Sequence, residues 1–449
     1  MRIGMSSVDI TPRVGVELSG FGPFLNRYSV GVKLPLLAKG IAFAVGGRMA
    51  VIVNCELIGV TRETARQACV LIRREIPALA EKDILICATH THSGPATGCL
   101  HGWGEPDPLY LELLPDRIAA AGIAAVNALE PATIEFGTAR CEHIGLNREY
   151  ETDAPPLETV LNPEWRSQCP EKTDTEVKVL KFVRPDGSLL GFAAYFGCHP
   201  VVCCQMTHWI HGDFPAVALI RLQQEFPGAL GVFLQGAQGD VNSCVVHKPE
   251  AESLAALEVI GERFAVSIRE ALRNAAPIAV NDLRTVQFEA LFSARSGVDI
   301  AYLERMERDN LARIHAPDAV PESQECRMAM VHLMAARKLL KQLRTDSLRG
   351  TWAPIAGLRL GPVVLLASPF EIMHAIKEEV TAKAVAPIPL VLGITNDSLG
   401  YAPDRHCAAR GGYAADMVPI ICGTLPFADI HRELVAALLK VDAELARNP

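Results

Sequence analysis

Apolar and polar positions along the chain follow two patterns that alternate. Short apolar runs rich in valine and isoleucine are separated by longer stretches in which apolar residues recur every three or four positions. The first pattern is typical of strands buried on both faces, and the second is typical of amphipathic helices. Their alternation predicts an α/β fold with layered mixed β-sheets flanked by helices.

The predicted strands are the short apolar runs. They lie at residues 49–56, 83–88, 133–137, 177–183, 189–196, 230–234, 286–291, 358–367 and 389–394. Helical spacing predicts packing helices at residues 62–75, 109–128 and 252–274.

Residues 300–348 depart from this alternation. The pattern predicts a charged helical pair, broken around Ala316-Pro317 and Pro321, which is interpreted as an insertion or lid. No repeat and no Ser/Gly linker marks a boundary, so residues 1–449 are expected to form a single domain.

Composition narrows the class of protein. Apolar residues make up 49% and charged residues 21% of the chain, as in packed globular proteins. The net charge is −8 and no Lys/Arg run is present, so nucleic acid is not an expected partner. Neither a long apolar span nor a signal-peptide pattern is found, which predicts a cytoplasmic protein without a stable membrane anchor.

The cysteines favour the same compartment. Their number, 13, is odd and their spacing is irregular, which predicts reduced and mostly buried thiols. Cys198, Cys203 and Cys204 offer a Cys/His zinc cluster, but adjacent cysteines lack the Cys-x-x-Cys spacing of such sites. They are interpreted as small buried apolar residues.

The clearest chemical signal is an apolar segment that runs into two histidines. Residues 84–88 are followed by His90, His92 and the chain breaker Gly94-Pro95. In extended backbone, residues two apart point the same way, so both imidazoles are expected to project from a strand end. Imidazole is the commonest metal ligand, and α/β sheets bind ligands at strand ends. The pattern favours a site over two surface histidines.

A second apolar segment ends at His199-Pro200, which makes His199 another candidate ligand. His208 and His211 come after it, and they are expected to support the site or to lie on the surface. A third segment leads into a glycine-bearing loop, residues 236–239, that either approaches a substrate closely or forms an ordinary turn.

Taken in order, these segments resemble the catalytic amino-terminal domain of the neutral/alkaline ceramidases. The shared motifs are Val8-Asp9-Ile10-Thr11-Pro12, Thr-His-Thr-His-Ser-Gly-Pro at 89–95, His199-Pro200, Gln-Gly-x-x-Gly-Asp-Val at 235–241, Ser368-Pro369-Phe370-Glu371, and Asn396 with Tyr401 five positions later. The resemblance spans nearly the whole chain and implies the fold of that catalytic domain.

The resemblance also implies a metal centre. A zinc ion (Zn2+) would be held by four side chains, His90, His199, Glu371 and Tyr401. His92 would bind substrate or stabilise a developing oxyanion, and Arg148 would face the site. Without the resemblance, Glu371 could equally be a helix N-terminal carboxylate and Tyr401 a core aromatic residue.

The chain departs from the family pattern at two places. Asn242 stands where the ceramidases carry a serine, with Ser243 one position later, so a serine nucleophile is in doubt and a zinc-activated water is expected. Asn242 is expected to contribute a hydrogen bond to substrate. The sequence also ends without the carboxy-terminal immunoglobulin-like domain of the ceramidases, so the resemblance does not imply activity on membrane ceramide.

The function expected from these features is zinc-dependent hydrolysis of an amide, or less readily an ester, in a small or medium polar N-acyl substrate. The alternatives are a genuine ceramidase acting on N-acyl sphingoid lipids, a zinc-dependent lyase or isomerase, and a non-catalytic metal-binding protein. The expected partner is a small-molecule substrate, and the oligomeric state, a homo-oligomer included, is left open.

Overall fold

Three β-sheets form the body of the protein. The computed structural model describes residues 1–345 and 350–447. The first sheet has the order β5 (Ile84–Ala88), β4 (Arg48–Cys55), β3 (Leu37–Val45), β1 (Arg2–Asp9) and β6 (Glu130–Pro131). The second has the order β12 (Leu230–Gln235), β10 (Leu189–Phe196), β9 (Glu176–Val183), β7 (Thr133–Arg140) and β14 (Ala276–Pro277). The third has the order β15 (Leu283–Ser293), β16 (Gly350–Leu360), β17 (Val363–Ala367) and β19 (Ile388–Leu392).

The three sheets share one apolar core. Phe43 of the first sheet, Phe182 of the second and Leu365 of the third belong to the same buried cluster. Each sheet therefore buries one face in this cluster and needs cover on the other, which explains why so many strands are apolar throughout.

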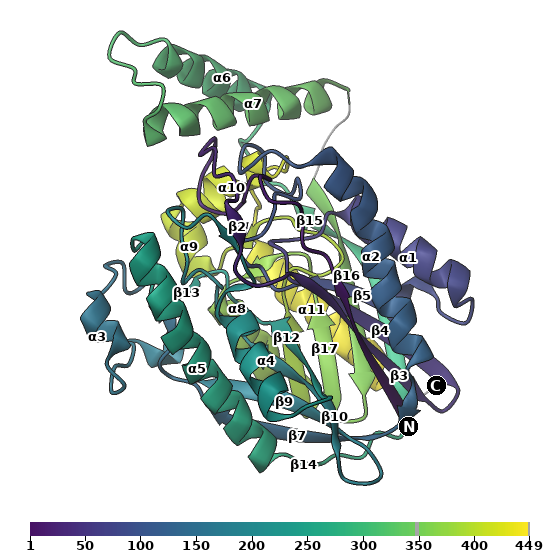
Figure 1. Cartoon of the computed structure of the whole chain (residues 1–449). Helices are drawn as coiled ribbons and strands as arrows, with labels where there is room; N and C mark the ends of the chain where they lie inside the picture. The colour runs from purple at the N-terminus through teal and green to yellow at the C-terminus, as the bar shows by residue number, and fades with distance from the viewer. Residues whose placement is uncertain (346–349, 448–449) are drawn as a thin grey trace.

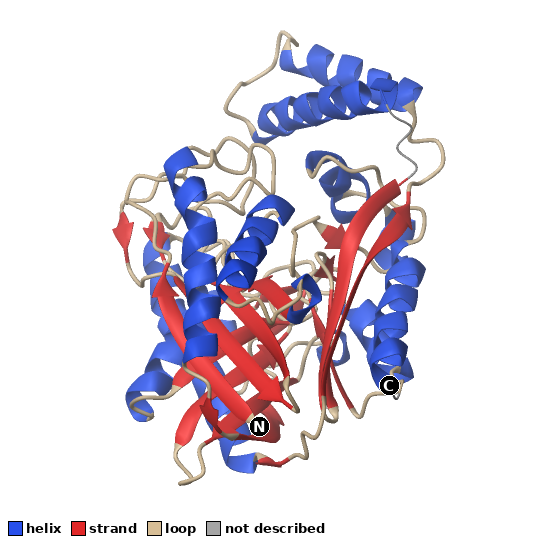
Figure 2. Cartoon of the chain, turned by 90° about the vertical axis from the view of Figure 1, so that its right-hand side faces the viewer, coloured by secondary structure: helices blue, strands red, loops and turns tan. Residues whose placement is uncertain are grey.

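Helices cover the outer faces (Figures 1 and 2). The first sheet packs against α1 (Arg62–Glu75) and α2 (Pro108–Asn127), the second against α4 (Asp213–Glu225) and α5 (Glu250–Asn274), and the third against α8 (His374–Lys383) and α11 (Ile430–Ala446). The mixed, layered α/β fold expected from the sequence is confirmed.

Each sheet contains one parallel strand pair. These pairs are β4 with β5, β10 with β12, and β17 with β19. The segments that come directly after β5, β10, β12, β17 and β19 carry the motifs of the sequence analysis, so strand ends from all three sheets supply candidate functional residues.

Small two-stranded sheets hold these segments. They pair β2 (Gly31–Val32) with β11 (Trp209–Ile210), β8 (Gly145–Asn147) with β13 (Val241–Ser243), and β18 (Glu371–Ile372) with β20 (Tyr401–Ala402). The remaining helical segments are α3 (Leu157–Leu161), α9 (Arg405–Arg410), α10 (Val418–Ile421), a π-helical turn at Tyr413–Met417, and 3-10 turns at Glu81–Asp83 and Pro170–Lys172.

The helical pair expected within residues 300–348 is confirmed as α6 (Ile300–Ile314) and α7 (Gln324–Thr345), and residues 346–348 lie outside the described ranges. We call the segment 300–345 the helical hairpin. It stands at the top of the view in Figure 1 and rests on α10 and on the loop around Trp103. Its role as an insertion or lid stays a prediction.

One predicted strand is wrong. Residues 358–367 form the end of β16 and all of β17, which are antiparallel neighbours joined by a turn at Gly361-Pro362. Gly361 has a φ of +57°, a value that suits glycine and reverses the chain inside an apolar run. Strands β1 and β3 were not predicted, because polar residues such as Lys39 interrupt their apolar pattern.

Two further observations concern the thiols and the helices. All 13 cysteines are free, and most of them are buried. Among the described helices, none is long and apolar enough to cross a membrane.

Candidate metal centre

His90 lies two residues beyond β5 and is 2% exposed. Its φ is +68°, so the extended backbone assumed in the sequence analysis does not continue to this residue. The His90 and His92 rings nevertheless meet, with centroids 4.8 Å apart, because the chain turns there. Nδ1 of His90 lies 2.6 Å from the carbonyl oxygen of Ile58. A carbonyl only accepts, so Nδ1 carries the proton and Nε2 of the neutral ring keeps its lone pair.

His199 enters the same space from β10 and is 1% exposed. Its Nδ1 lies 3.2 Å from the carbonyl oxygen of Val241, which again leaves the lone pair on Nε2. A bridge between His199 and Asn242 fixes the strand end against β13. Burial lowers the pKa of His199 to about 4, so the ring is neutral near pH 7.

Glu371 and Tyr401 are brought together by backbone pairing. They are direct partners in the parallel pair β18 and β20, although 30 positions separate their numbers in the chain. Glu371 therefore lies in a short strand, three residues ahead of α8, and not at the N-terminus of that helix. Burial raises the pKa of the Tyr401 hydroxyl well above its ordinary value, against the opposing effect of Arg148.

Three acceptor atoms converge on one point. Nε2 of His90 and Nε2 of His199 lie 3.4 Å and 3.2 Å from the same oxygen, Oε2 of Glu371. Burial opposes ionisation of Glu371, but the charge and the hydrogen bonds that His90 and His199 provide when they are protonated hold its pKa well below the ordinary value. Two ligands about 2.0–2.1 Å from a tetrahedral zinc ion are about 3.3 Å apart, so these separations fit a zinc ion between the groups.

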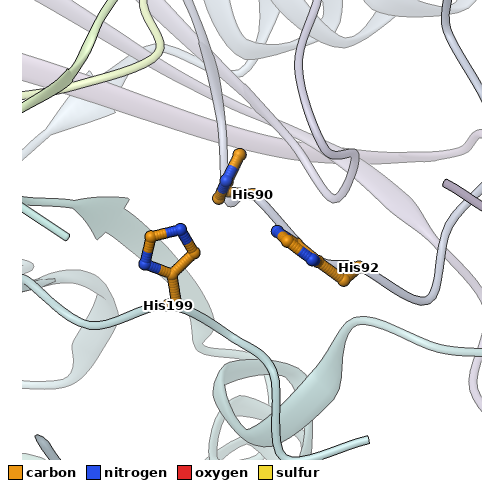
Figure 3. A group of neighbouring side chains, drawn as sticks. All are labelled: His90, His92 and His199. Atoms are coloured by element: carbon orange, nitrogen blue, oxygen red, sulfur yellow. The ribbon is translucent and has the colours of Figure 1, made fainter. Parts of the chain in front are cut away.

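His92 is the third member of what we call the histidine cluster, His90, His92 and His199 (Figure 3). Their candidate ligand nitrogens all lie within 4.8 Å of one another. Neither ring nitrogen of His92 has a hydrogen-bond partner among the residues that the structure describes. Burial lowers the pKa of His92 well below its ordinary value, and the neighbouring His90 and His199 lower it further. A neutral imidazole with two free nitrogens can donate to a substrate or serve as a ligand.

Arg148 and Asn242 lie beside the cluster. Nη2 of Arg148 donates to the carbonyl oxygen of Gly239 at 2.6 Å, Nη1 lies 3.5 Å from Oδ1 of Asn242, and the guanidinium stacks on the Tyr401 ring at 5.2 Å. Asp240 positions this group, because its backbone oxygen accepts from the N–H of Arg148.

The glycine-bearing loop packs against the segment that carries Glu371. A side chain at Gly239 would lie 2.6 Å from the carbonyl oxygen of Glu371, so this glycine lets the backbone of Glu371 approach the loop. Asp240 joins the same two segments: one of its carboxylate oxygens accepts from the backbone N–H of His374 and the other from the Asn147 amide. The loop thus positions Glu371, and its glycine serves backbone packing.

A cavity of about 550 Å³ opens onto the cluster. Five of the sequence-predicted residues line it, namely His92, Arg148, His199, Asn242 and Tyr401, whereas His90 and Glu371 are not among its described lining residues. Its volume is that of a site for a small or medium molecule. Ser93 and Ser243 are fully buried and are not among the described lining residues, and Oγ of Ser243 accepts from the N–H of Val245.

Sequence reasoning missed the support for His92. Arg27 is buried and donates to the backbone carbonyl of His92 at 2.8 Å and to that of Ser19 at 3.0 Å. Gly20, with φ +120°, leaves the space that the His92 ring fills, since a side chain there would lie 2.4 Å from Nδ1. Phe21 packs edge-on against the ring, with centroids 4.9 Å apart. The glycine-rich stretch around residue 20 signalled only a loop.

A second buried group, Cys203, His211 and Asp213, resembles a metal site by proximity. The Asp213 carboxylate accepts from three backbone N–H groups, those of Val202, Cys203 and Phe214. Nδ1 of His211 accepts from the N–H of Asp213, which places the ring proton on Nε2. Backbone groups thus occupy the Asp213 carboxylate and Nδ1 of His211, whereas Nε2 of His211 is buried without a partner among the described residues. His208 is half-buried and contacts the carbonyl oxygen of Tyr28.

These features define the class of protein: a mixed α/β protein with buried histidines and a carboxylate gathered at strand ends from three sheets. The profile of the family described as "Neutral/alkaline non-lysosomal ceramidase, N-terminal" matches residues 1–252. That match covers more than half of the chain, and the protein belongs to this family.

Individual ceramidases are also similar to this chain in sequence and in structure. A neutral ceramidase of Pseudomonas aeruginosa is 24% identical over 261 residues, which is 55% of this chain and 38% of that protein. The chain thus spans well under half of that relative's length. The crystal structure of neutral ceramidase from Pseudomonas aeruginosa is similar over 100% of this chain and 75% of its own, with a TM-score of 0.71 at 18% identity. A structure of a ceramidase complexed with C2 gives 0.72 at 17% identity, over 99% and 75% of the two chains.

Proposed function

We propose that this protein is a zinc-dependent hydrolase that cleaves an amide bond, or less readily an ester, in a small or medium polar N-acyl substrate. The observation that carries the proposal is the convergence of His90 and His199 on Glu371, with each Nε2 atom 3.2–3.4 Å from the same carboxylate oxygen, beside a cavity that His199 lines. Membership of the ceramidase family supports amide hydrolysis as the reaction class.

The side chains that would hold zinc are His90, His199, Glu371 and Tyr401. Two neutral imidazoles and a carboxylate are borderline and hard donors that suit this ion. Tyr401 completes the set because Arg148 stacks on its ring and favours the phenolate, as would a nearby cation. A bound zinc ion supplies Lewis acidity that polarises a carbonyl group and makes water more acidic.

The other residues of the cavity bind and orient the substrate. His92 can donate a hydrogen bond to an oxygen that gains negative charge, since its ring nitrogens have no partner within the described part of the chain. Arg148 supplies a fixed positive charge beside the same point, held by Gly239 and Asn242. Asn242 faces the cavity and offers an amide for a further substrate hydrogen bond.

Water, and not a serine, is the nucleophile in this proposal. The position that the family motif gives to a serine is Asn242, and an amide cannot form an acyl-enzyme ester. Ser243 points away into the protein and its oxygen accepts from the backbone.

The metal content of purified protein and the hydrolysis of a panel of N-acyl amides and matched esters would test the proposal together. We expect about one zinc per chain and faster turnover of amides. Adding an N-acyl sphingoid base to the panel separates this function from genuine ceramidase activity, which the name of the Pseudomonas relative keeps as the second candidate. Absence of zinc, or of hydrolysis of any amide or ester, would overturn the proposal.

A further inference from the structure

The cavity beside the histidine cluster is partly built by the helical hairpin. Gln324, Arg327 and Met328 of α7 line it, together with the loop at Gly20–Leu25 on the far side of His92. The hairpin thus supplies side chains to the surface that a substrate would contact.

The charges of this lining have one sign. Arg148 and Arg327 are its arginines, and no Asp or Glu is found among the described lining residues. The whole protein has a net charge of −8, so the cavity is a local positive region in an acidic protein. A cleft that carries one sign of charge raises the local concentration of ligands of the opposite sign.

Arg327 has no carboxylate partner among the described residues, as is also the case for Arg305 and Arg308, but of these three it is the one that lines the cavity. Arg313, Arg337 and Arg344 each pair with a carboxylate on the hairpin. Arg327 has no carboxylate within 4.0 Å in the described ranges, and its Nη1 donates only to the backbone oxygen of Glu322. Its Nε is buried and lacks a partner in that same part of the chain.

A guanidinium that has no carboxylate partner and lies at a cavity wall can bind a planar anion such as a carboxylate. Arginine presents parallel N–H donors that bind a carboxylate in a bidentate manner. Arg148 is occupied by Gly239, Asn242 and the Tyr401 ring next to the cluster, whereas Arg327 comes from the hairpin and keeps a free donor. Arg327 is therefore suited to a substrate group remote from the scissile bond.

We propose that the substrate carries a carboxylate at the end remote from the bond that is cleaved, and that Arg327 is the residue that selects it. This inference rests on the proposed hydrolase function and narrows its substrate class to N-acyl compounds with an anionic end.

Matched pairs of substrates test the inference. One pair compares the 4-nitroanilide of adipic acid, with its free carboxylate, and that of hexanoic acid. A second pair compares N-hexanoyl-6-aminohexanoate and N-hexanoyl-hexylamine, so that the charge lies on the amine half. We expect the charged member of one pair to have a KM that is lower by roughly 10-fold to 100-fold, because a hydrogen bond to a charged group stabilises the complex by an amount that corresponds to this ratio. This preference should decrease as the salt concentration rises.

Variants assign the preference to one residue. Arg327→Gln is expected to abolish the preference by raising the KM of the charged member to that of the neutral member, and Arg327→Glu is expected to reverse the preference. Arg337→Gln, which removes the same charge from the same helix outside the cavity, serves as the control and is expected to keep it. Equal KM values within both pairs, or a preference that survives Arg327→Gln, would overturn the inference.

Calorimetric binding of the same four compounds separates the two proposals. If none is hydrolysed but the charged member binds more tightly through Arg327, the hydrolase proposal fails and the anion site stands. If the neutral members are hydrolysed as well as the charged ones, the hydrolase proposal stands and the anion site fails.

Discussion

The histidine cluster and the helical hairpin border the same cavity, but they are built in different ways. His90 and His199 are almost completely buried, lie directly beyond strands of the shared core, and have their Nδ1 atoms fixed by backbone carbonyls. The hairpin is joined to the body by a few apolar contacts, such as Leu339 and Leu340 with Ile420.

If both of our proposals hold, this difference separates the chemical step from substrate recognition. Groups that must be held within a fraction of an ångström gain from rigid strand ends, whereas a recognition surface can vary without disturbing them. Changes in the histidine cluster should therefore abolish the reaction, and changes in the hairpin should alter which substrate is accepted.

The largest effect is expected from His90→Ala and His199→Ala. Each variant should lose its zinc and at least about 4 kcal/mol of transition-state stabilisation, roughly a thousandfold in rate. Elemental analysis and the rate of amide hydrolysis measure both effects. His208→Ala, a half-buried histidine outside the cavity, is the control. Zinc at the wild-type level in both cluster variants would refute the ligand assignment.

The residues that support the histidine cluster are expected to contribute more to the free energy of unfolding than the exposed ion pairs of the hairpin. Asp174 accepts from the N–H of Gly197, just ahead of His199, at 2.8 Å and pairs with the buried Lys377. Asp174→Asn removes one of the two carboxylates that pair with Lys377 and leaves Glu378 at 3.0 Å, so it should cost about 1.5–3 kcal/mol in urea unfolding at pH 7. Glu304→Gln, which breaks an exposed pair on the hairpin, should cost less than about 1 kcal/mol. Equal losses would remove the distinction between the two regions.

The pair of Asp174 and Lys377 also predicts that the free energy of unfolding depends on pH. Burial alone would raise the pKa of Asp174, but Lys377 and His374 hold it below the unfolded value of 3.8. The ionised carboxylate therefore stabilises the fold above pH 3.8, and this contribution is lost as the pH falls through the lower folded pKa. The free energy of unfolding of Asp174→Asn should lack this loss. A parallel decline in both proteins below about pH 4 would contradict the prediction.

His92→Ala distinguishes a ligand from a substrate contact. Because His92 donates to substrate in our proposal, the variant should keep its zinc and lose about 100-fold to 1,000-fold in kcat. His92→Gln, which restores an N–H donor, should recover part of the rate. Loss of zinc in His92→Ala would instead make His92 a ligand.

The smallest effect is expected at the serines. Ser93→Ala and Ser243→Ala should keep hydrolysis within roughly tenfold, about 1.4 kcal/mol, because neither residue lines the cavity among the described residues. Mass spectrometry of enzyme quenched during turnover should find no acylated serine. An adduct on Ser93 or Ser243 would show that water is not the first nucleophile.

Much of the body could be predicted from the sequence because its strands are buried on both faces. The strand at Leu189–Phe196 and the helix at Arg62–Glu75 have the predicted bounds. Strand β3 could not be predicted, because the charge of Lys39, its third residue, is acceptable only through its buried pairing with Glu56, a residue of the loop after β4.

The candidate site, too, could be predicted only in part from the sequence. His90, His92 and His199 stand out because histidines come directly after apolar strands, which is a local signal. The contact between Glu371 and Tyr401 depends on strand pairing, and the approach of α7 to the cavity depends on packing against α10. Such long-range contacts leave no local pattern, so Arg327 could not be found among the many charged residues of the hairpin.

The core shared by three sheets has a consequence for synthesis of the chain on the ribosome. His90 and His199 emerge early, but Glu371 and Tyr401 emerge only when most of the third sheet has been made. Until then the inner faces of the first two sheets, including Phe43 and Phe182, lack the cover of the third. The nascent chain therefore exposes a large apolar surface until the third sheet has been made, and the candidate metal centre can be completed only after Tyr401 has been added.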